Sequence, residues 1–172
     1  IEIHPDSPET IYIATASGGI YKTTDDGETW QHQFFESPVI SIGDMAIDPS
    51  NENILFAGTG EANSSSFSFL GNGIYKSEDG GDSWANSGLV ETGYFGRIIV
   101  DYINPQRVYA AALGSLFTPD SNRGVYRSDD SGESWDQVLF LTDSTSAVDL
   151  VQHPENPEIL YASMWERMRG LD

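Results

Sequence analysis

Short apolar runs alternate with turn residues along the whole chain. The runs are rich in Ile, Val, Tyr and Phe, and Gly, Pro, Asn and Asp bound them. This pattern is typical of β-strands joined by turns, and no window shows the sustained apolar period of a helix. The sequence therefore predicts an all-β protein.

The runs recur in a fixed order. A strand centred on an aromatic residue occurs four times, at Tyr12, Phe56, Tyr109 and Tyr161. An eight-residue motif, which we call the box, occurs three times, at residues 23–30, 77–84 and 128–135. Its form is Ser/Thr-x-Asp-x-Gly-x-Ser/Thr-Trp, and its tryptophans lie 54 and 51 residues apart. A fixed period in this range indicates a repeat architecture.

One repeat can be written as four strands, A to D, at residues 44–47, 54–59, 73–77 and 83–87. Four short antiparallel strands per repeat predict a β-propeller blade. A β-sandwich is the alternative, but it has no reason to repeat a turn sequence in register. We expect one partial propeller domain over residues 1–172, with blades at about 1–36, 37–89, 90–142 and an incomplete 143–172. We also expect a fragment of a longer protein, whose remaining blades would be partners of this chain.

The box lies at the C–D turn, and its residues are suited to forming that turn. Its glycine can take the positive φ of a tight turn, and its aspartate can accept hydrogen bonds from the turn. Its tryptophan can pack between adjacent sheets. Because every repeat carries the box, we predict a structural turn instead of a catalytic or calcium site. The residues concerned are Asp25, Gly27, Trp30, Asp79, Gly81, Trp84, Asp130, Gly132 and Trp135.

The boxes resemble the Asp-box, or BNR, repeats of sialidases, sortilins, xyloglucanases and photosystem II assembly factors. Residues 58–61, 96–101 and 164–167 resemble bacterial sortilin-type BNR-repeat proteins that are often labelled glycosyl hydrolases. This resemblance implies a β-propeller fold and an extracellular or periplasmic location in a bacterium. Fold alone does not imply an activity.

Length variation is concentrated between strands B and C. The distance from the strand B aromatic to the strand C tyrosine is 9, 19 and 17 residues in the three repeats. In an up-and-down blade the B–C and D–A loops emerge on the side opposite the boxes. That side would carry residues 61–72, 91–95, 116–123, 142–146 and 165–171. Insertions confined to one side predict a binding surface there.

Charged residues align at the start of strand A, the innermost strand of a blade. Asp44, Arg97 and Asp149 occupy equivalent positions, and Glu61 and Glu166 align just past strand B. Glycoside hydrolysis needs two carboxyl groups, so Asp44, Asp149, Glu61 and Glu166 are the candidate catalytic residues. Their spacing identifies no pair. A salt-bridge network that orders the channel is the alternative.

Further residues on the variable-loop side are candidate ligand contacts. They are Arg97, Asn63, Tyr94, Phe95, Phe117, Trp165 and Arg167. Phe67, Phe69 and Leu70 fall on the same side. Aromatic side chains there could stack on sugar rings, anchor a peptide, or pack the long loops onto the blades.

The composition of the chain excludes several classes of partner and ligand. The net charge of −19, from 27 acidic and 8 basic residues, repels phosphate backbones and argues against nucleic acid. No apolar run reaches membrane-spanning length, so no membrane insertion is expected. The chain has no cysteine and its three histidines are scattered, so no zinc site is expected. No cofactor or metal is expected, and loosely bound calcium is left open.

The sequence favours a sortilin-like binding or scaffold module that takes a peptide, protein or glycan on the B–C/D–A loops. The alternative is part of a BNR-repeat glycoside hydrolase, xyloglucanase-like or sialidase-like, acting on a polysaccharide or glycan. The chain departs from sialidases because Arg97 is followed by Ile98 and Ile99 and not by Ile-Pro. Catalytic activity is left open.

Overall fold

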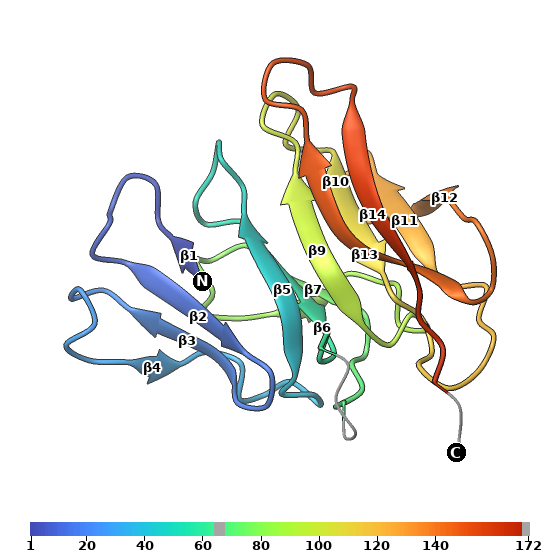
Figure 1. Ribbon diagram of the computed structural model, residues 1–172. Coiled ribbons are helices and arrows are strands. Elements are labelled where there is room, and N and C mark those ends of the chain that lie inside the picture. The colour runs from blue at the N-terminus through green and yellow to red at the C-terminus, as the bar shows by residue number, and fades with distance from the viewer. Residues whose placement is uncertain (64–67, 170–172) are drawn as a thin grey trace.

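The computed structural model describes residues 1–63 and 68–169, which form β-strands and turns without a helix. The strands make four antiparallel sheets, and the order within each sheet follows the chain (Figure 1). Blade 1 contains β1 (Glu2–Ile3), β2 (Ile11–Thr15), β3 (Gly19–Thr23) and β4 (Gln31–His32). Blade 2 contains β5 (Ile42–Ile47), β6 (Leu55–Thr59), β7 (Ile74–Ser77) and β8 (Ala85–Asn86). Blade 3 contains β9 (Phe95–Val100), β10 (Val108–Ala112), β11 (Gly124–Ser128) and β12 (Asp136–Leu139), and blade 4 contains β13 (Thr145–Gln152) and β14 (Leu160–Glu166).

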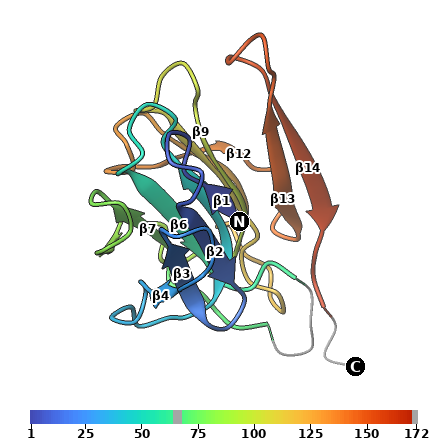
Figure 2. The same cartoon turned by 90° about the vertical axis from the view of Figure 1, so that its left-hand side faces the viewer.

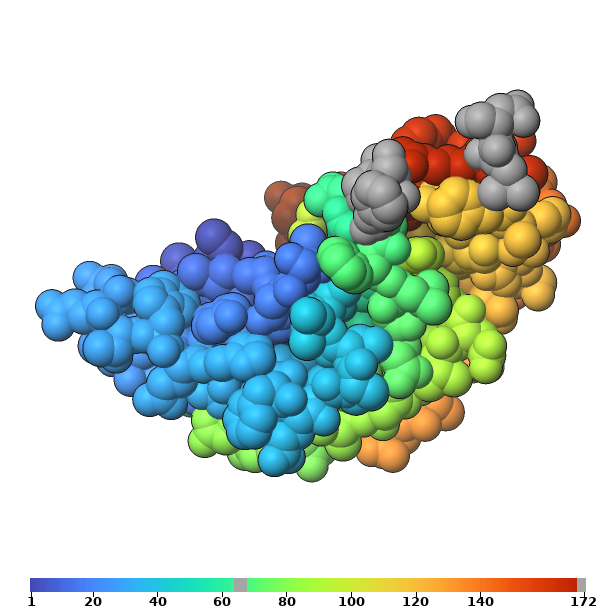
Figure 3. Space-filling model, turned by 90° about the horizontal axis from the view of Figure 1, so that it is seen from below, coloured from blue at the N-terminus to red at the C-terminus, as the bar shows by residue number. Residues whose placement is uncertain are grey.

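This arrangement is a partial β-propeller, which confirms the predicted fold class. The blades follow one another from one end of the molecule to the other (Figure 3). The inner strand β9 contacts β5 on one side and β13 on the other. The outer strand β8 is shorter than the strand predicted at residues 83–87, because the box turn extends through Trp84.

The hydrophobic cores lie between successive blades. The strand B aromatics Tyr12, Phe56 and Tyr109 are 1%, 0% and 7% exposed, and each belongs to a different core cluster. Their fourth counterpart, Tyr161, is 58% exposed on blade 4. Figure 2 shows β13 and β14 at the edge of the molecule, with no sheet on their outer side.

Three inner strands carry a β-bulge at the same place. The pairing with strand B skips Gly43 in β5, Gly96 in β9 and Val148 in β13. A Cβ on Gly43 would overlap the Phe95 carbonyl oxygen, and one on Gly96 would overlap the Val148 carbonyl oxygen. Glycine at the first two bulges therefore allows neighbouring inner strands to approach closely.

Hydrogen bonds between loops define two sides of the molecule. Each box donates to the A–B loop of its own blade, from Asp26 N to Glu9 O (3.1 Å), Gly80 N to Asn53 O (2.9 Å) and Ser131 N to Gln106 O (2.7 Å). On the other side, B–C loops bond to D–A loops, as from Gly71 N to Gly93 O (2.8 Å) and Asp120 N to Asp143 O (2.9 Å). We call these the box side and the variable-loop side. No helix in the described ranges is long and apolar enough to cross a membrane.

Candidate functional site

Each box closes on itself through its aspartate. In the first box, Thr29 N and Thr29 Oγ1 donate to the Asp25 carboxylate at 2.8 and 2.6 Å, and Thr23 Oγ1 donates at 2.6 Å. Asp79 and Asp130 accept the same three bonds from Ser83 and Ser77 and from Ser134 and Ser128. The carboxylates are therefore committed to the turn.

The box backbone requires two successive residues with positive φ. Gly27, Gly81 and Gly132 have φ of 89°, 90° and 89°, as the sequence predicts. The residue before each glycine also has positive φ: 59° at Asp26, 71° at Gly80 and 57° at Ser131. Asp and Gly tolerate this region better than most residues, which accounts for the first two.

The indole N–H of each box tryptophan has a partner, but the third box differs. Trp30 Nε1 and Trp84 Nε1 donate within their own boxes, to Gly27 O (3.1 Å) and Gly81 O (2.9 Å). Trp135 Nε1 instead donates to Ser87 O of blade 2 at 2.7 Å. Ser87 Oγ donates in return to Gly132 O at 2.6 Å. This reciprocal pair of bonds joins blades 2 and 3.

Hydrogen bonds hold the box carboxylates in the ionised form. Those from Thr23 and Thr29 lower the pKa of Asp25 to about 2, and those from Ser134 and Ser128 lower the pKa of Asp130 to about 2. For Asp79, burial opposes the shift, but the bonds from Ser83 and Ser77 together lower its pKa. Saturated, strongly acidic carboxylates make poor proton donors. The box geometry fits a structural turn.

The structure brings the three aligned inner-strand residues together. Arg97 of β9 lies between Asp44 of β5 and Asp149 of β13. Its Nη1 is 3.5 Å from Asp44 Oδ1, and its Nε donates to Asp149 Oδ1 at 2.8 Å. Asp44 Oδ2 also accepts from Ile98 N at 2.7 Å. A β-bulge lies directly before each of the three residues in its strand.

The pKa values of the two aspartates in this cluster are shifted in opposite directions. Burial raises the pKa of Asp44, although the Ile98 N–H and Arg97 oppose the shift. The hydrogen bond from Arg97 lowers the pKa of Asp149. Burial also raises the pKa of the nearby Glu2, and the charge of Asp44 adds to that increase. Within the aspartate pair, the pKa of Asp44 is therefore raised and that of Asp149 is lowered.

The other two candidate acids lie on the variable-loop side. Glu61 Oε2 accepts from Phe69 N at 3.4 Å, and its charge acts on Tyr94 and Arg167. Glu166 is exposed at the end of β14 and accepts from Ser144 Oγ at 3.4 Å.

Three predicted ligand contacts prove to be buried. Tyr94, Phe95 and Arg167 are 5%, 0% and 3% exposed. Phe95 packs in the core between blades 2 and 3, and the Arg167 guanidinium lies 5.9 Å from the Tyr94 ring centre. Their burial corrects the expectation that they are exposed, because Phe95 packs between two sheets, Tyr94 packs with Leu113 and Leu116, and Arg167 lies on Tyr94.

Other predicted contacts are accessible. Phe69, Phe117 and Trp165 are 53%, 47% and 54% exposed, and Asn63 and Leu70 are exposed as well. The side chain of Arg97 is 45% exposed. Phe67 lies outside the described residues.

Arg123 organises the variable-loop side and was not predicted. Its side chain is 0% exposed. Nη1 donates to Leu113 O, Ser146 Oγ and Arg167 O at 2.9, 2.5 and 2.9 Å, and Nη2 donates to the carbonyls of Ser115 and Thr118. Its counterparts in the other repeats are Gly18 and Asn72, so an arginine out of pattern was the only signal in the sequence.

Within the described residues, no three or more His, Asp or Glu side chains are placed to hold a metal ion.

Comparison with known proteins finds similarity to xyloglucanases over part of their length. No family model matches. Xyloglucanase Xgh74A of Acetivibrio thermocellus is 26% identical over 175 residues, covering 80% of this chain and 19% of that protein. A xyloglucanase of Paenibacillus sp. is 26% identical over 166 residues, covering 78% and 15%.

Solved structures show the same fold. An ancestral GH74 enzyme superposes with a TM-score of 0.71 at 22% identity, over 98% of this chain and 23% of that one. The GH74 enzyme of Niastella koreensis gives 0.67 at 23% identity, over 94% and 25%. The chain thus spans about a fifth of the curated relatives that it matches.

Proposed function

We propose that this chain forms blades of a glycoside hydrolase-like propeller that acts on a polysaccharide related to xyloglucan. The observation that carries the proposal is the similarity to two xyloglucanases across about four fifths of the chain. It favours the hydrolase alternative over the binding module that the sequence favoured. We also propose that the boxes are Asp-box, or BNR, repeats, and that the propeller resembles those of sortilin-type proteins.

Asp44 and Asp149 are the best-placed catalytic carboxyl pair. Both contact the same guanidinium of Arg97, so their separation cannot exceed the upper end of the range that glycosidases use, roughly 10 Å. One is pushed toward its protonated form and the other toward its ionised form. Carboxyl groups whose pKa values diverge in this way are suited to acid and base roles. A substrate that displaces the Arg97 contact would free the pair for these roles.

Further blades are proposed as partners of blade 4. Tyr161 is the repeat counterpart of three buried aromatics but is 58% exposed, and Val151 and Trp165 beside it are 56% and 54% exposed. A following blade would bury this face as β9 and β10 bury Phe56. The ligand proposed for the variable-loop side is carbohydrate, and the proposed location is extracellular or periplasmic, where a polymeric substrate is accessible.

The test is turnover by the full-length protein on a glycan panel that includes xyloglucan. We expect Asp44→Asn and Asp149→Asn to lower kcat about 100-fold or more, because acid–base groups contribute roughly 100- to 10,000-fold. Glu61→Gln and Glu166→Gln test the other candidates, and exposed Glu155→Gln is the matched control. Unchanged turnover in both aspartate variants would reject this pair.

A binding module is the second candidate, favoured by the exposed Phe69 and Phe117. It predicts saturable peptide or glycan binding that Phe117→Ala weakens, with no turnover on the panel. Hydrolysis by the parent protein would remove the binding-only function.

A further inference from the structure

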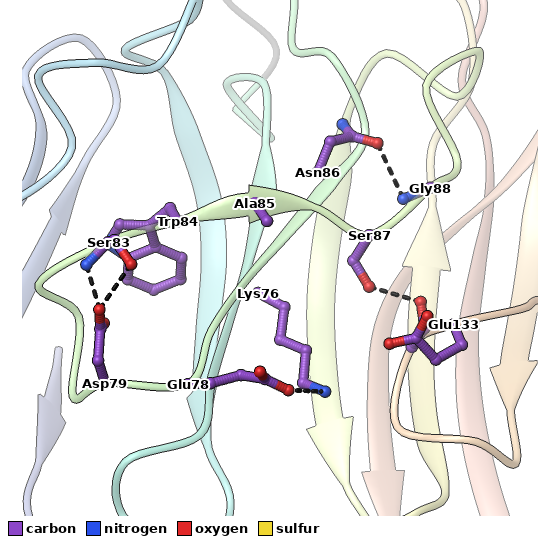
Figure 4. A pocket seen from close by; sticks show the side chains of 11 residues that line it. Lys76, Glu78, Asp79, Ser83, Trp84, Ala85, Asn86, Ser87, Gly88 and Glu133 are labelled. Carbon is purple, nitrogen blue, oxygen red and sulfur yellow. Dashed lines mark hydrogen bonds and ion pairs between the residues drawn. The ribbon is translucent and has the colours of Figure 1, made fainter.

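A groove of about 580 Å³ lies along the outer edge of blade 2, facing the box of blade 3. Figure 4 shows its walls: Trp84, Ala85, Asn86 and Ser87 on one side, Lys76 with Glu78 at its base, and Glu133 across from them. The volume falls in the range of small-molecule sites. The groove is separate from the inner cluster around Arg97.

The groove exists because blade 2 departs from the repeat. After the box tryptophan, blade 2 has Ala85, Ser87 and Gly88 at the first, third and fourth positions. The larger counterparts are Gln31, Gln33 and Phe34 in blade 1, and Asp136, Val138 and Leu139 in blade 3. The equivalent positions of blade 1 line two smaller spaces, one of about 60 Å³ at Lys22 and Gln31 and one of about 280 Å³ at Gln33, Phe34 and Asp82.

The groove is lined by the kinds of groups that bind sugars. Trp84 is half-buried, with the Phe34 ring against it at 5.5 Å between ring centres, and the indole lines the groove. Asn86 is exposed and uses one amide hydrogen on Asn72 O (2.9 Å), so its other amide hydrogen is available. Lys76 Nζ pairs with Glu78 at 2.8 Å and keeps further donors, and Glu133 is exposed on the opposite wall. Aromatic surface beside amide, ammonium and carboxylate groups suits the apolar ring faces and vicinal hydroxyls of a pyranose.

A peptide is the less suitable occupant. An extended peptide would add to the edge of β8, but this strand is only two residues long and offers few backbone groups for strand pairing. A basic peptide would gain from Glu133 but would meet the ammonium of Lys76.

We propose that this groove binds a neutral oligosaccharide and gives the protein a second glycan contact outside its inner cluster. The proposal concerns binding alone, so it stands or falls independently of hydrolysis by the full-length protein.

The test titrates the full-length protein with cellotetraose, followed by calorimetry and by tryptophan fluorescence. We expect saturable binding. Ala85→Gln introduces the larger residue found at the equivalent position of blade 1, and by filling the groove it should weaken binding about tenfold. Ala85 is exposed, so the variant should fold. Glu133→Ala should also weaken binding, whereas the reciprocal Gln31→Ala in blade 1 should leave the affinity unchanged.

Three results would overturn the proposal. The first is no saturable binding of cellotetraose. The second is an affinity that neither Ala85→Gln nor Glu133→Ala changes, which would place the sugar elsewhere. The third is binding of a lysine-rich peptide that Ala85→Gln abolishes while sugar binding persists, which would make the groove a basic-peptide site.

Discussion

The box side and the variable-loop side of this propeller are held together in different ways. Each box forms its hydrogen bonds over four residues, as from Thr29 to Asp25 and from Gly27 to Thr23. On the variable-loop side, Arg123 reaches Ser146 and Arg167, which are 23 and 44 residues away. Within each box the turn is closed by local bonds, and bonds such as Trp135 Nε1 to Ser87 O then join blades. On the variable-loop side, the Arg123 side chain bonds directly across blades.

This difference bears on function. A turn that satisfies its own polar groups can be repeated without change, which suits a structural element. Loops held by one buried arginine can vary in length and side chains while their anchor stays in place. The exposed Phe117 lies in such a loop, and Trp165 lies two residues before the Arg167 carbonyl that Arg123 holds.

The largest effect is expected for Arg123→Leu. The substitution removes the buried guanidinium that donates to the carbonyls of Leu113, Ser115 and Arg167, of which Leu113 O keeps a bond from Ser146 Oγ. We therefore expect about 3 kcal/mol of lost stability. Urea unfolding measures this loss. The control is Arg127→Leu, which removes a half-exposed ion pair with Asp129 and should cost about 1 kcal/mol or less. Equal losses would contradict the anchoring role of Arg123.

A smaller effect is expected for Gly96→Ala. The added Cβ overlaps the Val148 carbonyl, so β9 and β13 must separate, at a cost of about 2 kcal/mol. Val148→Ala, at the equivalent bulge of blade 4, should cost about 1 kcal/mol or less because a side chain is already accommodated there. Thermal unfolding of both variants checks the order. A reversed order would show that inner-strand spacing does not limit blade packing.

The smallest effect concerns acid stability of the box side. The folded-state pKa of Asp25 and Asp130 is about 2, below the ordinary value of 3.8. Their stabilising contribution is therefore fully present above the unfolded value and is lost as pH falls through about 2. Burial raises the pKa of Asp44, so its contribution to stability changes with pH in the opposite direction.

Asp130→Asn should therefore flatten the decline in unfolding midpoint between about pH 4 and pH 2, relative to the parent protein. Exposed Asp136→Asn is the matched control. If the two variants follow the same acid curve, the Asp130 carboxylate does not act through the box hydrogen bonds.

Much of the fold could be predicted from the sequence. The spacing of the boxes predicted the four-stranded blade, and the box glycines predicted the positive φ of the turn. Both predictions succeed because they depend on residues that are close in the chain. Alignment of the repeats also brought Asp44, Arg97 and Asp149 to one place, since equivalent positions in successive blades lie side by side. The loop residues were less predictable, and Tyr94 and Phe95 are buried where surface contacts were expected.

The sequence by itself determined the strand order, the turns and the side on which length varies, because these follow from local periodicity and turn chemistry. Only the tertiary structure decided the burial of Tyr94 and Arg123, the reciprocal bonds between Ser87 and the third box, and the groove beside Ala85. The physical reason is that burial and cavities depend on which blade faces each side chain. A residue without a counterpart in the other repeats, such as Arg123, leaves no period in the chain.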